Sequence, residues 1–346
     1  MLRYLTAGES HGKGLIAVLE GMPAGLKIEA ATINAELKRR QAGFGRGKRM
    51  QIENDKAEVV AGLRKGVSLG SPIALLIKNK DFSIDTLQQV VCPRPGHADL
   101  SGLLKFGFTD ARDVLERASA RSTAATVGIG ALCKILLRQF RITMNSGVVS
   151  VGGSQTRKAI KEKIQHAIAH KDTLGGIFEV MVEGVPAGLG SYVQPDRRLD
   201  SRLAGAVMSI PGIKAVEIGL GFGYAHKFGS EIHDAIYYSK SQGFYRRTNS
   251  AGGIEGGISN GENIVLRACM KPICTLMSPL DSVNIRSRRP AKASVQRSDI
   301  CVVESAGVVA ESAAAYVLAD ALLEKFGSDS LSDIKASYAS YLKRIR

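Results

Sequence analysis

Two histidines in glycine-containing turns are the first candidates for acid–base chemistry. His11 lies in the segment Gly8-Glu9-Ser10-His11-Gly12, and His97 follows Arg94-Pro95-Gly96. Turns on a rigid scaffold often carry functional side chains, and imidazole, with an ordinary pKa of about 6.5, gives or takes a proton near neutral pH. For either histidine alone, a structural hydrogen bond is the simpler interpretation.

Metal-binding patterns are weak in this sequence. His166 and His170 are four residues apart, a spacing that metal ligands use on a helix, but no carboxylate or cysteine completes a set beside them. We therefore expect no metal site and interpret this pair as a solvated helix face. The five cysteines form no CxxC pair, which argues against a zinc site and a disulfide framework and favours a reducing, cytoplasmic location.

Several segments combine cations, hydroxyls and glycines in a way typical of anion-binding sites. The segment 116–123 (ERASARST) places two arginines and several hydroxyls at the start of a predicted helix. Paired glycines in 252–257, with Lys271 and Thr275 further on, allow a close backbone approach to a flat, phosphorylated ligand. The loop 38–49 is the most basic stretch, and the segment 297–299 sets a carboxylate beside an arginine. A capped helix, hairpin turns and a solvated face are the alternatives.

The overall charge also favours an anionic partner. The chain of 346 residues has 47 lysines and arginines against 32 aspartates and glutamates, a formal charge of +15. Such a charge attracts nucleic acids and small polyanions alike, but aromatic residues make up only 5% of the chain and tryptophan is absent, so few rings are available to stack on bases. No apolar run is long enough to span a membrane and the N-terminus lacks a secretory signal, so neither nucleic acid nor membrane is an expected partner.

The elements that must position these residues are predicted from periodicity and capping. We expect helices at 32–40, 113–138, 156–170, 201–210 and 304–326, and strands at 15–19, 73–77, 177–182, 215–218 and 264–270. The small-residue faces of 113–138 and 304–326 predict a helical layer that is buried on both sides. The fold class is α+β or layered α/β, and the absence of a GxGxxG turn argues against a dinucleotide-binding Rossmann unit.

A repeated heptapeptide indicates an internal duplication. The sequence EGMPAGL at 20–26 and the sequence EGVPAGL at 183–189 each follow a β-rich run. We therefore predict one domain, 1–346, with two pseudo-equivalent halves of about 1–150 and 151–330 and a boundary near 148–156. The alternative is convergence on one turn chemistry, in which proline presets φ and glycine supplies a positive φ.

Taken in order, the motifs resemble those of the chorismate synthase family. They are GESHG at 8–12, EGMPAG at 20–25, RRQAGFGRG at 39–47, RPGHAD at 94–99, LERASAR at 115–121, AGGIEGGISNG at 251–261, KPICT at 271–275 and RSD at 297–299. The resemblance implies a β-α-β sandwich, with a helical layer between two antiparallel sheets, and a homotetramer. It also implies a reduced-FMN-dependent 1,4-anti elimination of phosphate from 5-enolpyruvylshikimate-3-phosphate, which gives chorismate as the last step of the shikimate pathway.

The same resemblance implies roles for individual residues. His11 would protonate the departing phosphate, His97 would lie near the flavin, and Asp299 with Ser10 would relay a proton at flavin N5. The positions that match FMN contacts are Arg117, Ala118, Ser119, Gly256, Lys271, Pro272, Ile273, Cys274, Thr275 and Arg297. The positions that match substrate or NADPH contacts are Arg40, Arg46, Arg94 and Arg121.

Departures from the family pattern and competing interpretations remain. The stretch 78–93 is short and irregular beside that of many relatives, and Phe108, Ser122 and Ile300 stand where many members have other residues. A bifunctional relative tends to be longer, so we expect a monofunctional enzyme that depends on an external flavin reductase, with NADPH as a possible reductant. The alternatives are a nucleic-acid binder, another FMN or phosphosugar enzyme on a related scaffold, and a structural subunit.

Overall fold

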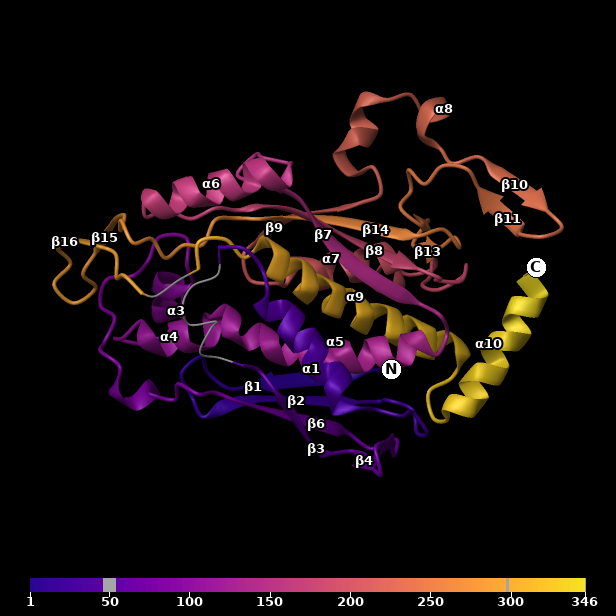
Figure 1. The fold of residues 1–346 in the computed structure, drawn as a ribbon, viewed down its shortest axis with the longest axis horizontal. Coiled ribbons are helices and arrows are strands. Elements are labelled where there is room, and N and C mark those ends of the chain that lie inside the picture. Colours follow the sequence, from indigo (N-terminus) through magenta and orange to yellow (C-terminus); the bar gives the residue numbers. More distant parts are fainter. Residues whose placement is uncertain (46–53, 297–298, 346) are drawn as a thin grey trace.

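The computed structural model describes residues 1–45, 54–296 and 299–345, which form two antiparallel sheets around a layer of helices (Figure 1). The first sheet has the order β1-β2-β6-β3, made by Arg3–Ala7, Gly14–Glu20, Ile73–Lys78 and Ala57–Ala61. The second has the order β7-β8-β14-β9, made by Thr143–Val151, Gly176–Glu183, Ile264–Met270 and Ile213–Ile218. The predicted sandwich of two antiparallel sheets around helices is confirmed.

Four helices fill the space between the sheets: α1 (Ala30–Gln41), α5 (Thr123–Arg138), α7 (Leu199–Met208) and α9 (Val303–Phe326). Almost all of α5 and α9 is buried, because each is covered by a sheet and by the other helix. By length and composition α9 and the run Arg112–Arg138 are apolar enough to cross a bilayer. Their burial identifies them here as core helices of the sandwich.

The remaining elements of the described residues lie around the sandwich. The helices are α3 (Asp99–Phe106), α4 (Arg112–Ala118), α6 (Arg157–Ala169), α8 (Gly229–Ile232) and α10 (Leu331–Ile345). The 3₁₀ turns are η1 (Ile84–Thr86), η2 (Ala120–Ser122), η3 (Pro195–Arg197) and η4 (Gly221–His226). The hairpins are β4–β5 (Leu63–Arg64, Val67–Ser68), β10–β11 (Ile236–Ser239, Gly243–Arg246), β12–β13 (Ile254–Glu255, Ile258–Ser259) and β15–β16 (Asp281–Val283, Pro290–Lys292).

The two halves share one topology. The series β1-β2-α1-β3-β6-α5 recurs as β7-β8-α7-β9-β14-α9, and the sheet orders correspond strand by strand. Even the hydrogen bonds at the repeated heptapeptide recur: Ser68 Oγ donates to the Pro23 carbonyl at 2.6 Å, and Ser259 Oγ donates to the Pro186 carbonyl at 2.6 Å. The correspondence therefore extends far beyond the one turn that the repeated heptapeptide forms.

The structure differs from two sequence predictions. Strand β7 spans Thr143–Val151, so the second sheet begins before the boundary expected near 148–156, and that range starts within the strand and continues beyond it. Helix 113–138 is also interrupted: α4 ends at Ala118, and Ser119 is extended with ψ of 140°. The Ser119 hydroxyl accepts a hydrogen bond from the Arg121 N–H at 3.3 Å, a local bond that competes with helix continuation.

A buried ionic network ties the helical layer together. Lys134 Nζ donates to Glu36 at 2.7 Å and to Glu311 at 2.6 Å, and Arg39 and Ser146 also donate to Glu311. Burial raises the pKa of the Glu311 carboxyl, but the hydrogen bonds and charges of Arg39 and Lys134 outweigh burial and hold it below its ordinary value. The network therefore joins α1, α5, α9 and β7 through satisfied charges.

Close helix packing in the same layer gives a testable prediction. A Cβ at Gly130 in α5 would lie 2.2 Å from the Ser312 Cβ in α9, whereas a Cβ at Gly205 in α7 would meet nothing within 4 Å. Gly130→Ala should therefore lower the free energy of unfolding by about 1–3 kcal/mol or more through overpacking. Gly205→Ala should raise it by up to about 1 kcal/mol through helix propensity.

Chemical denaturation of both variants beside the wild type measures this difference. If Gly130→Ala were as stable as Gly205→Ala, α5 and α9 would not be in contact at this position.

Candidate functional site

One carboxylate holds two of the predicted ligand-binding arginines. Asp55, which is buried just before β3, accepts hydrogen bonds from Arg40 at 2.7 Å and from Arg121 at 2.5 Å. Burial raises the pKa of Asp55, but the two guanidinium groups outweigh this effect and hold it below its ordinary value. Asp55 therefore stays ionised at neutral pH and brings the end of α1 and the turn η2 together.

Asn79 connects this ion cluster to the turn that carries His11. Its side-chain oxygen accepts a hydrogen bond from Arg121 Nε at 2.9 Å. Its amide nitrogen donates to the backbone carbonyls of Glu9, Ser10 and Gly12, the last at 2.7 Å. Because the two N–H groups of this amide are shared among three carbonyls of the turn, the 9–12 turn has a defined position relative to Arg121.

His11 is held by Glu116 of α4. The His11 Nδ1 atom lies 2.9 and 3.0 Å from the two carboxylate oxygens of Glu116, and the His11 backbone N–H donates to Oε2 at 2.8 Å. Arg112, one turn earlier on α4, lies 3.5 Å from the same carboxylate. Ser10 is buried beside this pair, with its hydroxyl 3.3 Å from the Ser119 hydroxyl.

His97 has a carboxylate partner of its own, Asp99. The His97 Nδ1 atom lies 2.5 Å from Asp99 Oδ1, and Arg94 binds both oxygens of the same carboxylate at 2.8 and 3.0 Å. Burial raises the pKa of Asp99, but the hydrogen bonds of His97 and Arg94 outweigh burial and hold it well below its ordinary value. Arg94 also donates to the Thr275 hydroxyl at 2.8 Å, which joins the His97 turn to the segment after β14.

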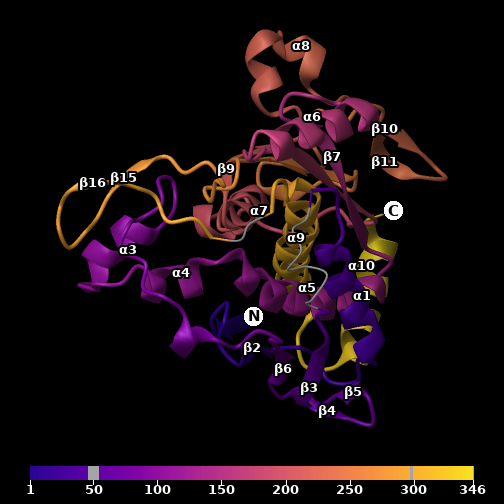
Figure 2. The same cartoon turned by 60° about the vertical axis from the view of Figure 1, so that its left-hand side comes forward.

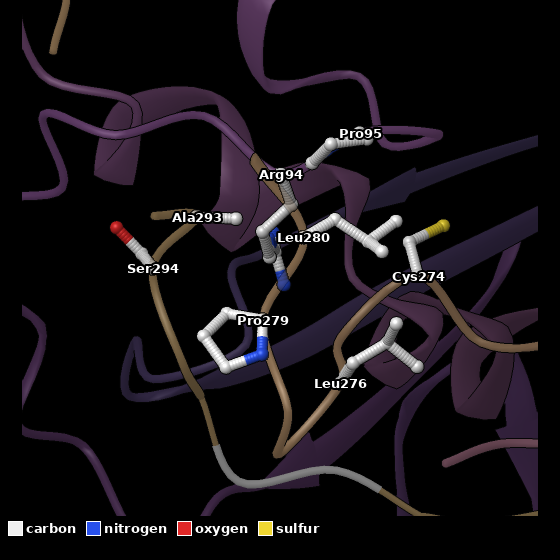
Figure 3. Close-up of a pocket in the computed structure, with 8 residues that line it drawn as sticks. All are labelled: Arg94, Pro95, Cys274, Leu276, Pro279, Leu280, Ala293 and Ser294. Atoms are coloured by element: carbon white, nitrogen blue, oxygen red, sulfur yellow. The ribbon is translucent and has the colours of Figure 1, made fainter. Parts of the chain in front are cut away.

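The segment 271–275 lies against the His97 turn. Lys271 Nζ and Cys274 Sγ both donate to the Gly96 carbonyl, and the two side chains are 3.0 Å apart. Figure 3 shows Arg94 in a small depression, with Cys274 on one side and Ala293 and Ser294, from the chain after β16, on the other. Hairpin β15–β16 and α3 lie at the same end of the molecule in both views (Figures 1 and 2).

Other predicted site residues have different surroundings. The Arg117 guanidinium donates to the Thr6 and Gly8 carbonyls, so its side chain supports the end of β1. Ala118 ends α4. Pro272 and Ile273 belong to the segment beside the His97 turn, where the Ile273 carbonyl accepts from Thr173 at 2.7 Å.

Asp299 lies beside the loop after α1, since the next residue, Ile300, donates its N–H to the Gly45 carbonyl at 2.9 Å. Arg46 and Arg297 lie outside the described residues.

Gly256 is not brought to the His97 turn within one chain. It lies in the β12–β13 hairpin, and Gly252, just before this hairpin, accepts the Val265 N–H near the start of β14, whereas Lys271 follows the Met270 end. A strand of this length separates its ends by about 20 Å. Figure 1 shows β13 and α3 at opposite ends of the molecule.

The carboxylates and the amide that hold the candidate site residues are not apparent from the motifs alone. Asp99 belongs to the RPGHAD motif, where a carboxylate two residues after a histidine in a turn is a sign of pairing. Glu116 directly precedes Arg117 in the LERASAR motif, but its histidine partner is 105 residues away. Asp55 and Asn79 belong to no motif, and only the fold reveals their partners.

The arrangement defines the class of protein. Each of two imidazoles is held on a carboxylate that also contacts a buried arginine: His11 on Glu116 with Arg112, and His97 on Asp99 with Arg94. Such groups suit an enzyme that performs acid–base chemistry on an anionic ligand. Among the residues with described positions, no three metal-ligating side chains form a cluster.

Comparison with known proteins agrees with this class and narrows it. The chorismate synthase family profile matches residues 2–323. The chain is 52% identical over 348 residues to a chorismate synthase of Thermoanaerobacter pseudethanolicus, covering all of this chain and 99% of that one. It is 50% identical over 385 residues to the enzyme of Moorella thermoacetica, covering all of both. A crystal structure of a chorismate synthase superposes with a TM-score of 0.83 at 41% identity, covering 99% of this chain and 98% of that one.

The chain therefore belongs to the chorismate synthase family. It is a carbon–oxygen lyase of aromatic amino acid biosynthesis that eliminates phosphate from 5-enolpyruvylshikimate-3-phosphate and yields chorismate. Enzymes of this family depend on a flavin. The phosphate and carboxylates of such a substrate explain why the site gathers cations.

The Asp99 pair gives a prediction for stability. Asp99→Asn leaves the buried Arg94 without its counter-ion and should lower the free energy of unfolding at pH 7 by about 3–5 kcal/mol. Because the pKa of Asp99 is lowered by folding, its contribution is complete at neutral pH and is lost as the pH falls below about 4. The variant should therefore lose less of its remaining stability than the wild type between about pH 4 and pH 2.

Denaturant unfolding at several pH values measures both effects. Glu29→Gln, which breaks an exposed ion pair with Lys27, is the matched control and should leave the stability nearly unchanged. An equally steep acid dependence in Asp99→Asn and the wild type would contradict this assignment.

Proposed function

We propose that the flavin of this enzyme is reduced FMN and that the segment around the His97 turn contributes to binding it. When bound, the reduced flavin would supply electron density transiently and take part in removal of the ring hydrogen. The donor set suits a flavin phosphate or ring edge: Arg94 and Lys271 are cations, and Thr275 is a buried hydroxyl. The Ser119 turn, with its hydroxyl beside Ser10, is the second contributor.

The observation that carries the acid–base proposal is the carboxylate behind each histidine. In this proposal His11 donates a proton to the departing phosphate oxygen, so that an N–H bond breaks as an O–H bond forms. His97, oriented by Asp99, would control protonation of the bound flavin. Asp299 and Ser10 would relay a proton at its N5 atom.

The arginines bind the anionic groups of the two ligands. Arg40 and Arg121 share Asp55, so this carboxylate holds two guanidinium groups close together. We propose that these two residues, with Arg94 and Arg46, receive the phosphate and carboxylates of the substrate or NADPH. Each charge-assisted hydrogen bond of this kind is worth about 1.5–3 kcal/mol.

The flavin needs a source of electrons before it can act. We propose a monofunctional enzyme in the cytoplasm whose FMN is reduced by a separate flavin reductase rather than by its own oxidation of NADPH. The support is the chain length of 346 residues, which leaves little room for the insertions of bifunctional relatives.

Replacement of His11 tests the proposed chemistry. His11→Ala should retain binding of FMN and substrate but lose about 10²–10⁴-fold in kcat, the usual contribution of a general acid. The assay is phosphate release under anaerobic conditions with dithionite-reduced FMN. The wild type should release none without a reductant or with NADPH alone. Wild-type kcat in His11→Ala would refute the role of His11, and release with NADPH alone would refute the need for a reductase.

The outer face of the first sheet supports a homotetramer. Its cross-strand pairs include Leu5 with Val18 and Ile16 with Leu76, and the Leu5 side chain is 74% exposed. At the positions of the second sheet that match Ile16 and Leu76 by topology, Glu179 and Arg267 form an ion pair at 3.1 Å. Since the two halves share one topology, the apolar pairs of the first sheet indicate a covered surface.

A second copy of this chain fits that surface by charge. The ion pairs Arg3–Glu20 and Lys78–Glu58 flank the apolar pairs, so each copy offers both signs of charge to a partner related by a twofold axis. In the assembly, the proposed Gly256 contact with FMN would come from a neighbouring copy. Within one chain, Gly256 lies at the opposite end of β14 from the His97 turn.

Charge insertion on this face tests the assembly. Leu5→Lys should reduce the oligomer size in sedimentation or light scattering, because it buries a charge without a partner. Asn145→Lys, at the matching position of β7, should leave the size unchanged. A monomeric wild type, or an intact tetramer of Leu5→Lys, would contradict this proposal.

A further inference from the structure

Two adjacent residues at the C-terminal end of α4, Glu116 and Arg117, form hydrogen bonds with the chain between Thr6 and His11. The Arg117 guanidinium donates to the carbonyls of Thr6 and Gly8 at 2.9 and 3.0 Å. The Glu116 carbonyl accepts the Ser10 N–H at 2.9 Å. These three hydrogen bonds hold the backbone of the turn, and none of them involves the contact between the Glu116 carboxylate and the His11 ring.

The Glu116 carboxylate makes the contact that these backbone bonds do not require. Its two oxygens lie 3.0 and 2.9 Å from His11 Nδ1, and its side chain is only 2% exposed. Burial raises the pKa of Glu116, but its hydrogen bonds to His11 and the charge of Arg112 outweigh burial and lower it. At neutral pH this group is therefore a carboxylate, which only accepts hydrogen bonds.

An acceptor at Nδ1 determines which nitrogen of the ring can exchange a proton with a ligand. Because the carboxylate has no proton to offer, Nδ1 must carry the hydrogen of this bond, and Nε2 lies on the edge of the ring away from Glu116. The same carboxylate fixes the ring orientation, since Oε2 also accepts the His11 backbone N–H.

We infer that Glu116 is a positioning residue that keeps the proton on His11 Nδ1 and fixes the orientation of the ring, so that the imidazolium form gives its Nε2 proton to the departing phosphate oxygen and becomes the neutral Nδ1–H tautomer. This inference rests on the proposed role of His11 as the acid for the departing phosphate. Glu116 acts through His11 and is not itself a catalytic residue. The competing explanation is that Glu116 only anchors the turn, as a buried carboxylate that accepts a backbone N–H.

Asp320 provides the control for that competing explanation. It is buried in α9, accepts the Leu2 N–H at 2.6 Å just before β1, and pairs with Arg202 at 2.6 Å. Like Glu116, it therefore combines a backbone N–H and a guanidinium and anchors one end of the same strand. It lies at the opposite end of β1 from the His11 turn, so Asp320→Asn reproduces the structural loss without touching His11.

The experiment compares five variants by anaerobic phosphate release with dithionite-reduced FMN: Glu116→Ala, Glu116→Gln, His11→Ala, the double variant Glu116→Ala/His11→Ala, and Asp320→Asn. Loss of orientation removes part of a general acid's contribution, so Glu116→Ala should lower kcat by about tenfold to a hundredfold. Its KM for the substrate should stay within about threefold, since binding is not the step affected. Glu116→Gln, whose amide oxygen can still accept from Nδ1–H, should retain more activity than Glu116→Ala.

Two further results separate positioning from anchoring. Addition of Glu116→Ala to His11→Ala should cause no further loss of kcat, because Glu116 acts only through His11. Asp320→Asn should lower the thermal midpoint while kcat stays within about twofold of the wild type. Equal kcat in Glu116→Ala and the wild type, an undiminished effect of Glu116→Ala in the double variant, or the same kcat loss in Asp320→Asn would overturn the inference.

A measurement that is independent of turnover distinguishes this inference from the proposed function. In ¹⁵N NMR of the labelled enzyme, the His11 ring should be protonated at Nδ1 in the wild type and in Glu116→Gln, and should lose this preference in Glu116→Ala. Wild-type kcat in His11→Ala would refute the proposed role of His11 alone, while an unchanged His11 tautomer in Glu116→Ala would refute the positioning by Glu116.

Discussion

Cations that must gather around an anionic ligand repel one another until the ligand arrives. In this protein buried carboxylates oppose that repulsion: Asp55 lies between Arg40 and Arg121, and Asp99 binds Arg94 through both oxygens. These carboxylates lose hydration on burial, so they are stable only with short contacts to their partners. The site therefore depends on segments that deliver a carboxylate and a cation to the same place, and the fold serves this requirement.

The two halves, which share one topology, contribute unequally to this requirement. The first half supplies both histidines, Asp55, Asp99 and most of the arginines, from the turn after β1, the end of α1 and the segments before α5. The second half contributes the segment 271–275 at the end of β14, which reaches the His97 turn through Thr275 and Lys271. The same topology thus carries the two carboxylate-held histidines in one half and a segment that packs against the His97 turn in the other.

The sequence predicted the framework where burial imposes a clear period. Helix 304–326 and strands such as 264–270 are covered on both faces or alternate regularly, so their composition reveals them. Strand β7 was missed because polar residues and Gly147 interrupt its alternation. The break at Ser119 was missed because a side-chain hydrogen bond to a nearby N–H overrides helical composition.

The candidate site was predicted only as far as its local motifs extend. The turns around His11 and His97 are continuous in sequence, so their residue types pointed to acid–base chemistry. The partners of these residues depend on the fold: Glu116 is 105 residues from His11, and Asp55 is 66 residues from Arg121. Gly256 is the reverse case, because a motif alone does not say where its residues lie in the fold. Its motif suggested a flavin contact, but within one chain Gly256 does not lie near the His97 turn.

We propose that one pocket, built on carboxylate-held cations and histidines, receives both the flavin and the substrate. A crystal structure of the assembled enzyme with FMN and 5-enolpyruvylshikimate-3-phosphate measures this directly. We expect the phosphate and carboxylates of the substrate to contact Arg40, Arg94 or Arg121, with His11 and His97 within hydrogen-bonding distance of the two ligands. Ligands bound on a different surface, with Asp55 and Asp99 still holding their partners and no ligand beside either histidine, would contradict the claim.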